Sequence, residues 1–163
     1  MLSAYITERS TMTLPAFEPF EYRKELESLL ISFLEECLPE SGRCLDIDGR
    51  HSYYKHIPEH FAGFWCMSDG KNIIGTVAVA ELNETDCELK SLYLSETYHG
   101  NGYGKRLLLH AVENAKSLGY KKMYLDSLST STKALELYRR TGFVETEKYN
   151  SNMFADVFMV LEL

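Results

Sequence analysis

The sequence lacks long apolar runs and has little of the residues that mark linkers or fibrous chains. None of its apolar runs approaches the roughly 18–20 residues that span a bilayer, and the polar segment Met1–Thr13 contains no hydrophobic stretch typical of a secretion signal. Only four prolines and ten glycines occur among 163 residues, too few for a linker-rich or collagen-like chain. These absences predict a cytoplasmic protein that is not inserted in a membrane.

An excess of basic charge is also missing. The chain has 17 Lys and Arg against 24 Asp and Glu, a formal net charge of −7. Unspecific binding to nucleic acid or to an anionic membrane needs an excess of positive charge. We therefore expect neither partner. An acidic surface suits a cationic substrate such as an amine, although it also serves solubility.

Metal-binding patterns are weak. The four cysteines form no CxxC pair, which argues against zinc, and a reducing compartment would leave them as free, mostly buried thiols. His51, His56 and His60 lie close in sequence, but Pro58 is expected to interrupt a helix joining the last two, and no further ligands complete a set. We predict no metal. This segment forms either part of an acceptor pocket or a surface loop; its candidate pocket residues are Arg50, His51, Tyr53, Tyr54 and His56.

The remaining composition indicates one domain. With 45% apolar residues and no internal repeats, we expect a lead-in over residues 1–15 and a single domain over 16–163. Helical periodicity predicts helices over 21–38, ended by Pro39, over 101–118 and over 132–141. Strands are predicted over 64–67, 73–80, 88–94, 123–125, 143–147 and 157–161, which gives an α/β order.

A glycine-rich loop is the most informative segment. Gly100, Gly102 and Gly104 follow a predicted strand and open a long helix, where backbone N–H groups and the helix dipole can bind an anion. Lys105 and Arg106 add positive charge. The loop fits neither GxGxxG nor GxxxxGK[ST], so a dinucleotide fingerprint and a P-loop are both poor matches. The pattern predicts a phosphate or diphosphate site, or a tight connection only.

In this loop the sequence resembles the GNAT superfamily of acyl-CoA-dependent N-acyltransferases. The family's (Q/R)xxGx(G/A) coenzyme A loop corresponds to residues 99–104, with His99 in place of the usual Gln or Arg. The resemblance extends to Leu92-Tyr93-Leu94 before the loop and to residues 134–143, which are similar to the family's "A..LY...GF" pattern. It covers roughly residues 60 to 163.

The resemblance implies a fold and a set of cofactor contacts. It implies a mixed, mostly antiparallel central sheet of six to seven strands flanked by about four helices, and acetyl-CoA as acyl donor. Backbone groups of one strand would bind pantetheine beside a splayed neighbouring strand. The implied cofactor-binding residues are Leu92, Tyr93, Leu94, His99, Gly100, Asn101, Gly102, Tyr103, Gly104, Lys105 and Ser131. Ser131 is interpreted chiefly as a helix N-cap, with a polar contact to the cofactor as its other role.

The resemblance also implies two catalytic residues. Glu88 stands where some family members have a general base, although it can equally pair with Lys90 or be exposed on the strand. Tyr138 matches the tyrosine that protonates the departing thiolate, and its other interpretation is a core aromatic. The segment Lys148–Ala155 would help to form the acceptor site.

These features predict an N-acetyltransferase. It would transfer acetyl from acetyl-CoA to the primary amine of a small-molecule or amino-acid-like acceptor by direct attack in a ternary complex. Two alternatives stay open: a protein N-acetyltransferase, and a non-catalytic CoA-binding or regulatory module of the same fold. The resemblance also makes a homodimer an expectation.

Overall fold

A seven-stranded sheet organises the protein. The computed structural model describes residues 12–163, and within them the strand order is β1-β2-β3-β4-β5-β7-β6. All neighbouring strands are antiparallel except β4 and β5, which are parallel. The strands are β1 (Phe20–Glu21), β2 (Gly63–Ser68), β3 (Ile73–Glu81), β4 (Asp86–Leu94), β5 (Lys122–Ser127), β6 (Val144–Glu145) and β7 (Val157–Glu162).

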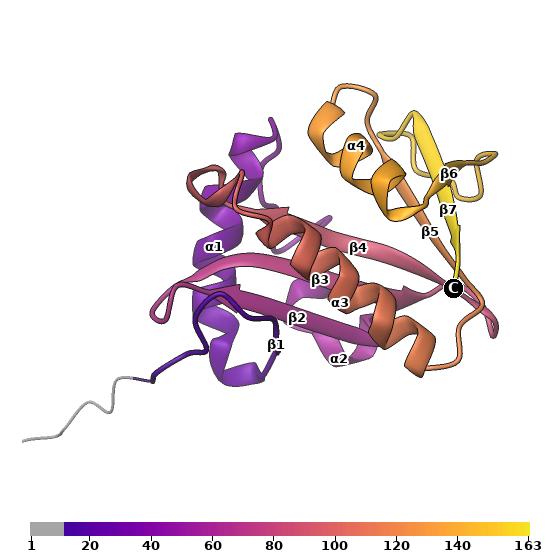
Figure 1. The fold of residues 1–163 in the computed structure, drawn as a ribbon. Coiled ribbons are helices and arrows are strands. Elements are labelled where there is room, and N and C mark those ends of the chain that lie inside the picture. Colours follow the sequence, from indigo (N-terminus) through magenta and orange to yellow (C-terminus); the bar gives the residue numbers. More distant parts are fainter. Residues whose placement is uncertain (1–11) are drawn as a thin grey trace, which may run out of the picture.

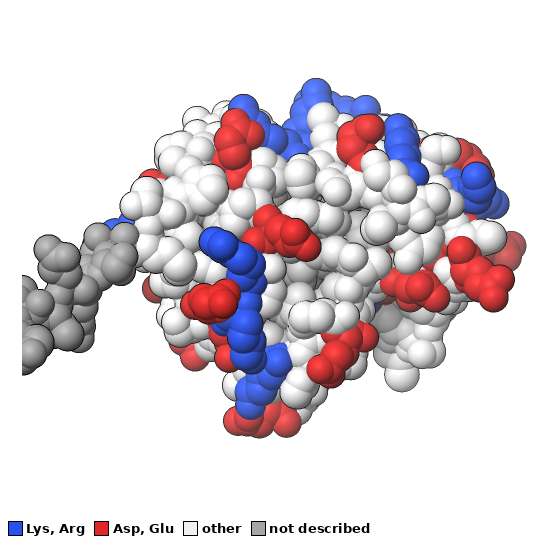
Figure 2. All heavy atoms as spheres, turned by 90° about the horizontal axis from the view of Figure 1, so that it is seen from below, with Lys and Arg blue, Asp and Glu red and all other residues white. Residues whose placement is uncertain are grey.

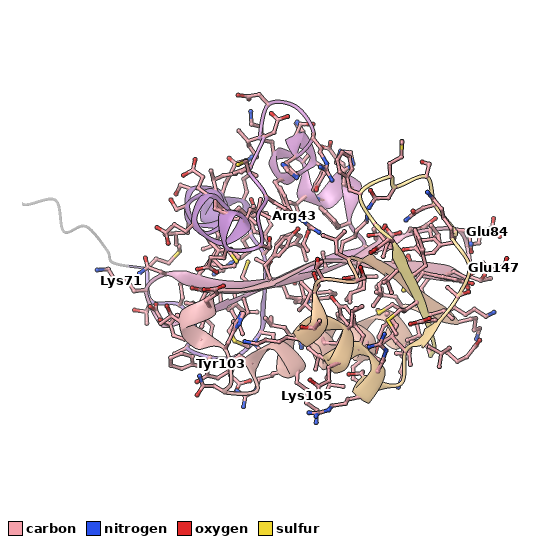
Figure 3. The ribbon with its side chains drawn as sticks, turned by 90° about the horizontal axis from the view of Figure 1, so that it is seen from above. Arg43, Lys71, Glu84, Tyr103, Lys105 and Glu147 are labelled. Atoms are coloured by element: carbon pink, nitrogen blue, oxygen red, sulfur yellow. The ribbon has the colours of Figure 1, made fainter. Side chains whose placement is uncertain are left out.

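Helices cover both faces of the sheet. Figures 1 and 3 show α1 and α2 on one face and α3 and α4 on the other. The α-helices of the described chain are α1 (Glu27–Glu40), α2 (Ile57–His60), α3 (Tyr103–Ser117) and α4 (Thr132–Thr141), with 3-10 turns at Lys24–Leu26, Ser52–Lys55 and Glu96–Tyr98. The expected fold class, a mostly antiparallel mixed sheet of six to seven strands with about four helices, is confirmed.

Each face has its own apolar core. α3 buries one stripe, which includes Leu107, Leu108 and Ala111, against strand residues such as Val77 and Leu125. On the other face, α1 packs against β2 and β3; the buried residues there include Leu30, Leu34, Tyr54, Phe64 and Ala78. Such alternate packing follows from the period of two along a strand, which sends neighbouring side chains to opposite faces.

The first predicted helix is wrong at both ends. Glu21 pairs with Trp65 in β1 instead of starting a helix, and α1 begins only at Glu27. Pro39 does not end the helix, because it lies inside the last turn. The stop is at Gly42, whose φ of 74° is left-handed and whose N–H donates to the carbonyl of Pro39, as is typical of a glycine just past a helix.

Two other predicted elements differ from the structure. Pro58 does not interrupt a helix before His60; it lies in the first turn of α2, where its fixed φ and missing N–H are tolerated. The strand predicted over residues 143–147 is only Val144–Glu145, because Phe143 is drawn into the core. The turn between β3 and β4 is closed by the hydrogen bond from Leu82 N–H to the Asp86 carbonyl.

Three further expectations bear on the surface and on the start of the chain. Cys37, Cys66 and Cys87 are buried free thiols and Cys44 is exposed, as predicted. The predicted lead-in lies mostly outside the described residues, although Leu14 is buried beside α1. Within residues 12–163 no helix combines the length and apolarity needed to cross a membrane. On the face seen in Figure 2, acidic and basic side chains are interspersed.

Candidate functional site: the opening between β4 and β5

β4 and β5 part after a short stretch of parallel pairing. Their register runs over Asp86, Cys87 and Glu88, and no β4–β5 pair follows Glu88 within the described chain. β4 nevertheless continues to Leu94, and β5 continues beside β7 as far as Ser127. Figure 1 shows the two halves of the sheet opening from this point. Backbone N–H and C=O groups of β4 that face the opening need partners, so they can bind an extended ligand.

A bulge at Ser91 fixes which side chains of β4 face each layer. Ser91 has a φ of 52°, and the register with β3 shifts beside it, which marks an extra residue in the strand. The Tyr54 and Ser91 hydroxyls lie 2.8 Å apart, and Thr76 donates to the Ser91 carbonyl at 2.7 Å. Because of the bulge, Leu92 packs with the α3 core whereas Tyr93 packs with the α1 core.

The amino end of α3 has the properties of an anion site. Gly102 is its N-cap residue with a φ of 79°, and no side chain caps the free N–H groups. The first turn contains no acidic residue. A Cβ built on Gly100 or Gly102 would meet no atom within 4 Å, so the space in front of these glycines is open. Free N–H groups and the positive end of the dipole therefore face this open space.

The side chains of the loop are held in different ways. The His99 imidazole lies 2.8 Å from the carbonyl oxygen of Leu94, and Asn101 donates to the carbonyls of Tyr98 and His99. Arg106 is not free for a ligand, because it donates to the Phe17 carbonyl and pairs with Glu18 at 2.9 Å. Lys105 is exposed on the α3 side of the sheet (Figure 3). Of the two predicted cations, Lys105 is the one without an ion pair in the described chain.

Tyr138 is a buried tyrosine of the apolar core on the α3 side of the sheet. It lies on α4, whose Leu135 belongs to the α3-side core, and its side chain is buried. Burial raises the pKa of the Tyr138 phenol above its ordinary value, Tyr93 and Asp126 raise this pKa further, and Arg43 lowers it. Two of these groups, Tyr93 and Arg43, belong to the α1 side of the sheet.

Glu88 stands at the last β4–β5 pair with a buried and already bonded carboxylate. Lys90 Nζ lies 2.6 Å from Glu88 Oε1, and the Asn150 amide donates to Oε2 at 3.2 Å. Desolvation alone would lower the pKa of Lys90, but the charge and hydrogen bond of Glu88 outweigh it and raise this pKa. The pair with Lys90, one interpretation left open by the sequence, is therefore present, and Oε2 keeps only one longer amide contact.

Asp126 lies on β5 on the same side of the sheet. Asn150 donates to Asp126 Oδ2 at 2.6 Å and Asn152 donates to the same oxygen at 3.2 Å. The Tyr149 hydroxyl is buried near these carboxylates and has no hydrogen-bond partner within residues 12–163. Burial, followed by Glu88 and Asp126, raises the pKa of Tyr149. Asn150 thus ties the β6–β7 loop to both carboxylates.

The segment after α1 closes this side of the site. His51 is buried, and its Nδ1 accepts the N–H of Asp46 at 2.9 Å. Burial and the charge of Arg50 lower the pKa of His51. The Arg50 guanidinium lies 4.1 Å from the centre of the Phe154 ring, so this segment contacts the β6–β7 loop. No group of three or more His, Cys, Asp or Glu in residues 12–163 is placed to hold a metal.

Ser131 takes the N-cap position of α4 without making the cap bond. Its hydroxyl makes no capping hydrogen bond, although its carbonyl accepts the N–H of Leu135 at 3.0 Å. The interpretation as N-cap is therefore right for the position and wrong for the hydrogen bond. Leu94 approaches Gly104 of α3, and Leu137 of α4 lies beside the same glycine. Leu94 and Gly104, two of the predicted cofactor residues, therefore lie together where β4, α3 and α4 meet.

Comparison with known proteins gives the family. Residues 25–143 match the sequence model of the acetyltransferase (GNAT) family. The chain belongs to the GNAT family. This membership confirms the resemblance found in the glycine-rich loop and in the "A..LY...GF" segment.

Relatives and solved structures agree with this membership. The chain is 31% identical over 101 residues to the uncharacterised N-acetyltransferase YjgM of Escherichia coli, and the match covers 60% of this chain and 59% of YjgM. A GNAT acetyltransferase from Staphylococcus aureus is similar in structure, with a TM-score of 0.79 and 20% identity over 89% of this chain and 98% of the other. YncA of Salmonella typhimurium, a putative acetyltransferase solved with its cofactor acetyl-CoA, is also similar in structure. Its TM-score is 0.69 and its sequence identity 16%, and the match covers 88% of this chain and 92% of the YncA chain.

Two charged residues beside the opening, Asp126 and Arg43, were not predicted from the sequence. Asp126 directly follows the predicted strand 123–125. Because side chains alternate along a strand, Asp126 would be expected on the face opposite to that of the buried Leu125. Arg43 follows Gly42 at the end of α1, and its guanidinium contacts the Tyr93 hydroxyl at 3.5 Å. Sequence offers no signal for this contact, because 50 residues separate its partners.

Proposed function

We propose that this GNAT protein is an N-acetyltransferase that transfers acetyl from acetyl-CoA to the primary amine of a small-molecule or amino-acid-like acceptor. The observation that carries the proposal is the opening between β4 and β5, with the buried phenol of Tyr138 on the α3 side of the sheet and the carboxylates of Glu88 and Asp126 on the other side. The two substrates would meet there in a ternary complex.

The residues at the amino end of α3 fit the diphosphate of acetyl-CoA. Gly100 and Gly102 leave open space, the helix N–H groups are uncapped, and Lys105 is free of ion pairs in the described chain. Phosphate oxygens are well accommodated by such an arrangement. Pantetheine would then run along β4 towards Glu88, and the backbone of Leu92 and Leu94 would bind its amides and polarise the thioester carbonyl.

The chemistry needs an uncharged amine and a protonated leaving group. Glu88, directly or through water, would take a proton from the acceptor ammonium. The amine nitrogen then attacks the thioester carbonyl; a C–N bond forms and the C–S bond breaks. Tyr138, whose raised pKa keeps the phenol protonated at neutral pH, donates its proton to the thiolate sulfur. The second proton of the nitrogen restores the phenol through solvent.

The variant Tyr138→Phe tests this function. It keeps the packed ring and removes only the hydroxyl, so we expect kcat to fall by roughly 100-fold or more while the Kd for acetyl-CoA stays near that of the parent. CoA release with a panel of primary amines measures kcat, and calorimetry measures Kd. Tight binding of acetyl-CoA without turnover on any amine, unchanged by Tyr138→Phe, would instead indicate the non-catalytic module.

Other expectations remain proposals. Acetylation of protein termini in place of small amines would appear when peptides outcompete the small amines in the same assay. The homodimer is tested by sedimentation, and the cytoplasmic location by fractionation. The domain limits of 16–163 are tested by removal of residues 1–15, which should leave CoA binding intact.

A further inference from the structure

A partly buried arginine without a carboxylate partner lies beside the opening. Arg43 follows the end of α1, where its N–H donates to the carbonyl of Leu38 and that of Gly42 donates to Pro39. These two bonds form the usual stop of a helix and fix the backbone from which the Arg43 side chain extends. Its guanidinium makes one long contact, 3.5 Å to the Tyr93 hydroxyl, and no ion pair with a carboxylate in residues 12–163.

Arg43 lies on the acceptor side of the sheet. Figure 3 places it above the sheet near α1, whereas Tyr103 and Lys105 at the start of α3 lie below the sheet. The sheet therefore separates Arg43 from the proposed diphosphate site. Its guanidinium contacts the hydroxyl of Tyr93, which lies on the part of β4 beyond the last β4–β5 pair, so Arg43 lies beside the opening where the acceptor would be bound.

Two charged side chains beside the opening, Arg43 and Asp126, have no ion pair in the described chain. Glu88 is already paired with Lys90 at 2.6 Å. Asp126 accepts only amide N–H groups, from Asn150 and Asn152, and has no cationic partner in the described chain. Partly buried charges cost free energy unless they are paired, so Arg43 and Asp126 together favour a ligand that carries both signs.

We infer that the acceptor bears a carboxylate as well as its amine, with Arg43 binding the carboxylate and Asp126 the ammonium. This inference rests on the proposed function, and it narrows the amine to amino-acid-like zwitterions. A planar guanidinium matches a carboxylate through two parallel N–H···O bonds. Held between the two charges, the nitrogen would lie beside Glu88 and face the thioester along β4.

Matched acceptors test the inference without any change to the protein. The panel consists of amino acids with increasing separation between amine and carboxylate, the amide of each, and the corresponding simple amine. With saturating acetyl-CoA, at least one amino acid should have a kcat/KM about 10- to 100-fold above that of its amide, as expected for a charge-assisted hydrogen-bonded pair. Equal values for every amino acid and its amide would overturn the inference and leave the acetyltransferase proposal intact.

The variant Arg43→Gln identifies the residue responsible. It should remove most of this preference by lowering kcat/KM for the amino acid, with little effect on the amide and on the Kd for CoA. Arg43→Lys keeps the positive charge but loses the planar guanidinium with its two parallel N–H groups. Its preference for the amino acid over the amide should therefore lie between those of the parent and of Arg43→Gln. Arg23→Gln is the control, because Arg23 is an exposed arginine outside the site. An equal loss for amino acid and amide in Arg43→Gln would contradict the assignment, and no turnover with any amine would overturn both proposals.

Discussion

The two faces of the sheet build their parts of the site by different means. On the α3 face the proposed binding groups are backbone N–H groups, exposed by Gly100 and Gly102 at a helix start. On the α1 face they are side chains, among them Glu88, Asp126 and Arg43, which come from three separate segments. The first design binds any ligand with the right anion, and the second can discriminate between acceptors.

This difference predicts that specificity for the acceptor resides in the side chains of the α1 face. A backbone cradle depends on chain conformation, so few residue types are needed to specify it. A side-chain network depends on each partner, because one lost group leaves another buried and unsatisfied. Asn150 illustrates the point, since its single amide contacts both Glu88 and Asp126. Changes on the α3 face should therefore act on CoA, and changes on the α1 face on the acceptor.

The first prediction concerns binding of the cofactor on the α3 face. Gly102→Ala places a Cβ in the open space before α3, where a phosphate would approach. We expect the affinity for CoA to fall by about 10- to 100-fold, the worth of a hydrogen bond to a charged group. Calorimetry with CoA and with acetyl-CoA measures this change.

Gly119→Ala is the matched control for Gly102→Ala. Gly119 has a similar left-handed φ of 92° and also has no atom within 4 Å of a built Cβ, but it lies at the other end of α3. Both changes should cost about 1–2 kcal/mol of stability from the strained backbone. If both variants weakened CoA binding equally, strain would explain the loss and the cradle would be refuted.

The second prediction concerns the side chains of the α1 face. Glu88→Gln removes the base and its charge while it keeps the shape of the side chain, and should lower kcat by roughly 100-fold. Asp126→Asn should raise the acceptor KM more than it lowers kcat, because Asp126 holds the amine. Steady-state kinetics over a range of acceptor concentrations separates these outcomes. A parental kcat and pH profile for Glu88→Gln would remove Glu88 from the mechanism.

More of the α3 face than of the α1 face could be predicted from the sequence. The glycines before α3 and the segment from Ala134 to Phe143 have fixed local meaning, so the family and the cofactor loop could be predicted from them. The same holds for α3, whose buried stripe recurs with helical period. The helix boundary at Pro39 was predicted wrongly, because α1 continues one residue past this proline and the αL residue Gly42 sets the stop.

The acceptor face could be predicted only in part. For Glu88 the pair with Lys90, one of its predicted interpretations, is present, since Lys90 is its i+2 neighbour on the same strand face. Asp126 and Arg43 were missed, because their roles arise from contacts between segments far apart in the chain. No periodicity in the sequence reports that Asn150 meets β4 and β5, or that Arg43 extends over the sheet to Tyr93.

The smallest effect concerns pH and the segment that closes the acceptor face. Burial lowers the pKa of His51 below its ordinary value of 6.5, and its Nδ1 must stay unprotonated to accept the Asp46 N–H. The unfolded chain therefore binds this proton at higher pH than the folded chain does. By linkage, stability is fully present above pH 6.5 and falls as the pH decreases through the folded pKa.

Thermal melting between pH 8 and pH 5 tests this linkage. The decline in Tm due to His51 should not exceed about 2–4 °C, the shift that a stability change of 1 kcal/mol produces in a domain of this size. His51→Gln, whose side-chain oxygen can still accept the Asp46 N–H, should remove this part of the decline. His56→Gln is the control, since His56 belongs to the same segment but is 57% exposed. If the decline in Tm persisted in His51→Gln and disappeared in His56→Gln, the titrating group would be His56. The linkage between pH and stability through the buried His51 would then be refuted.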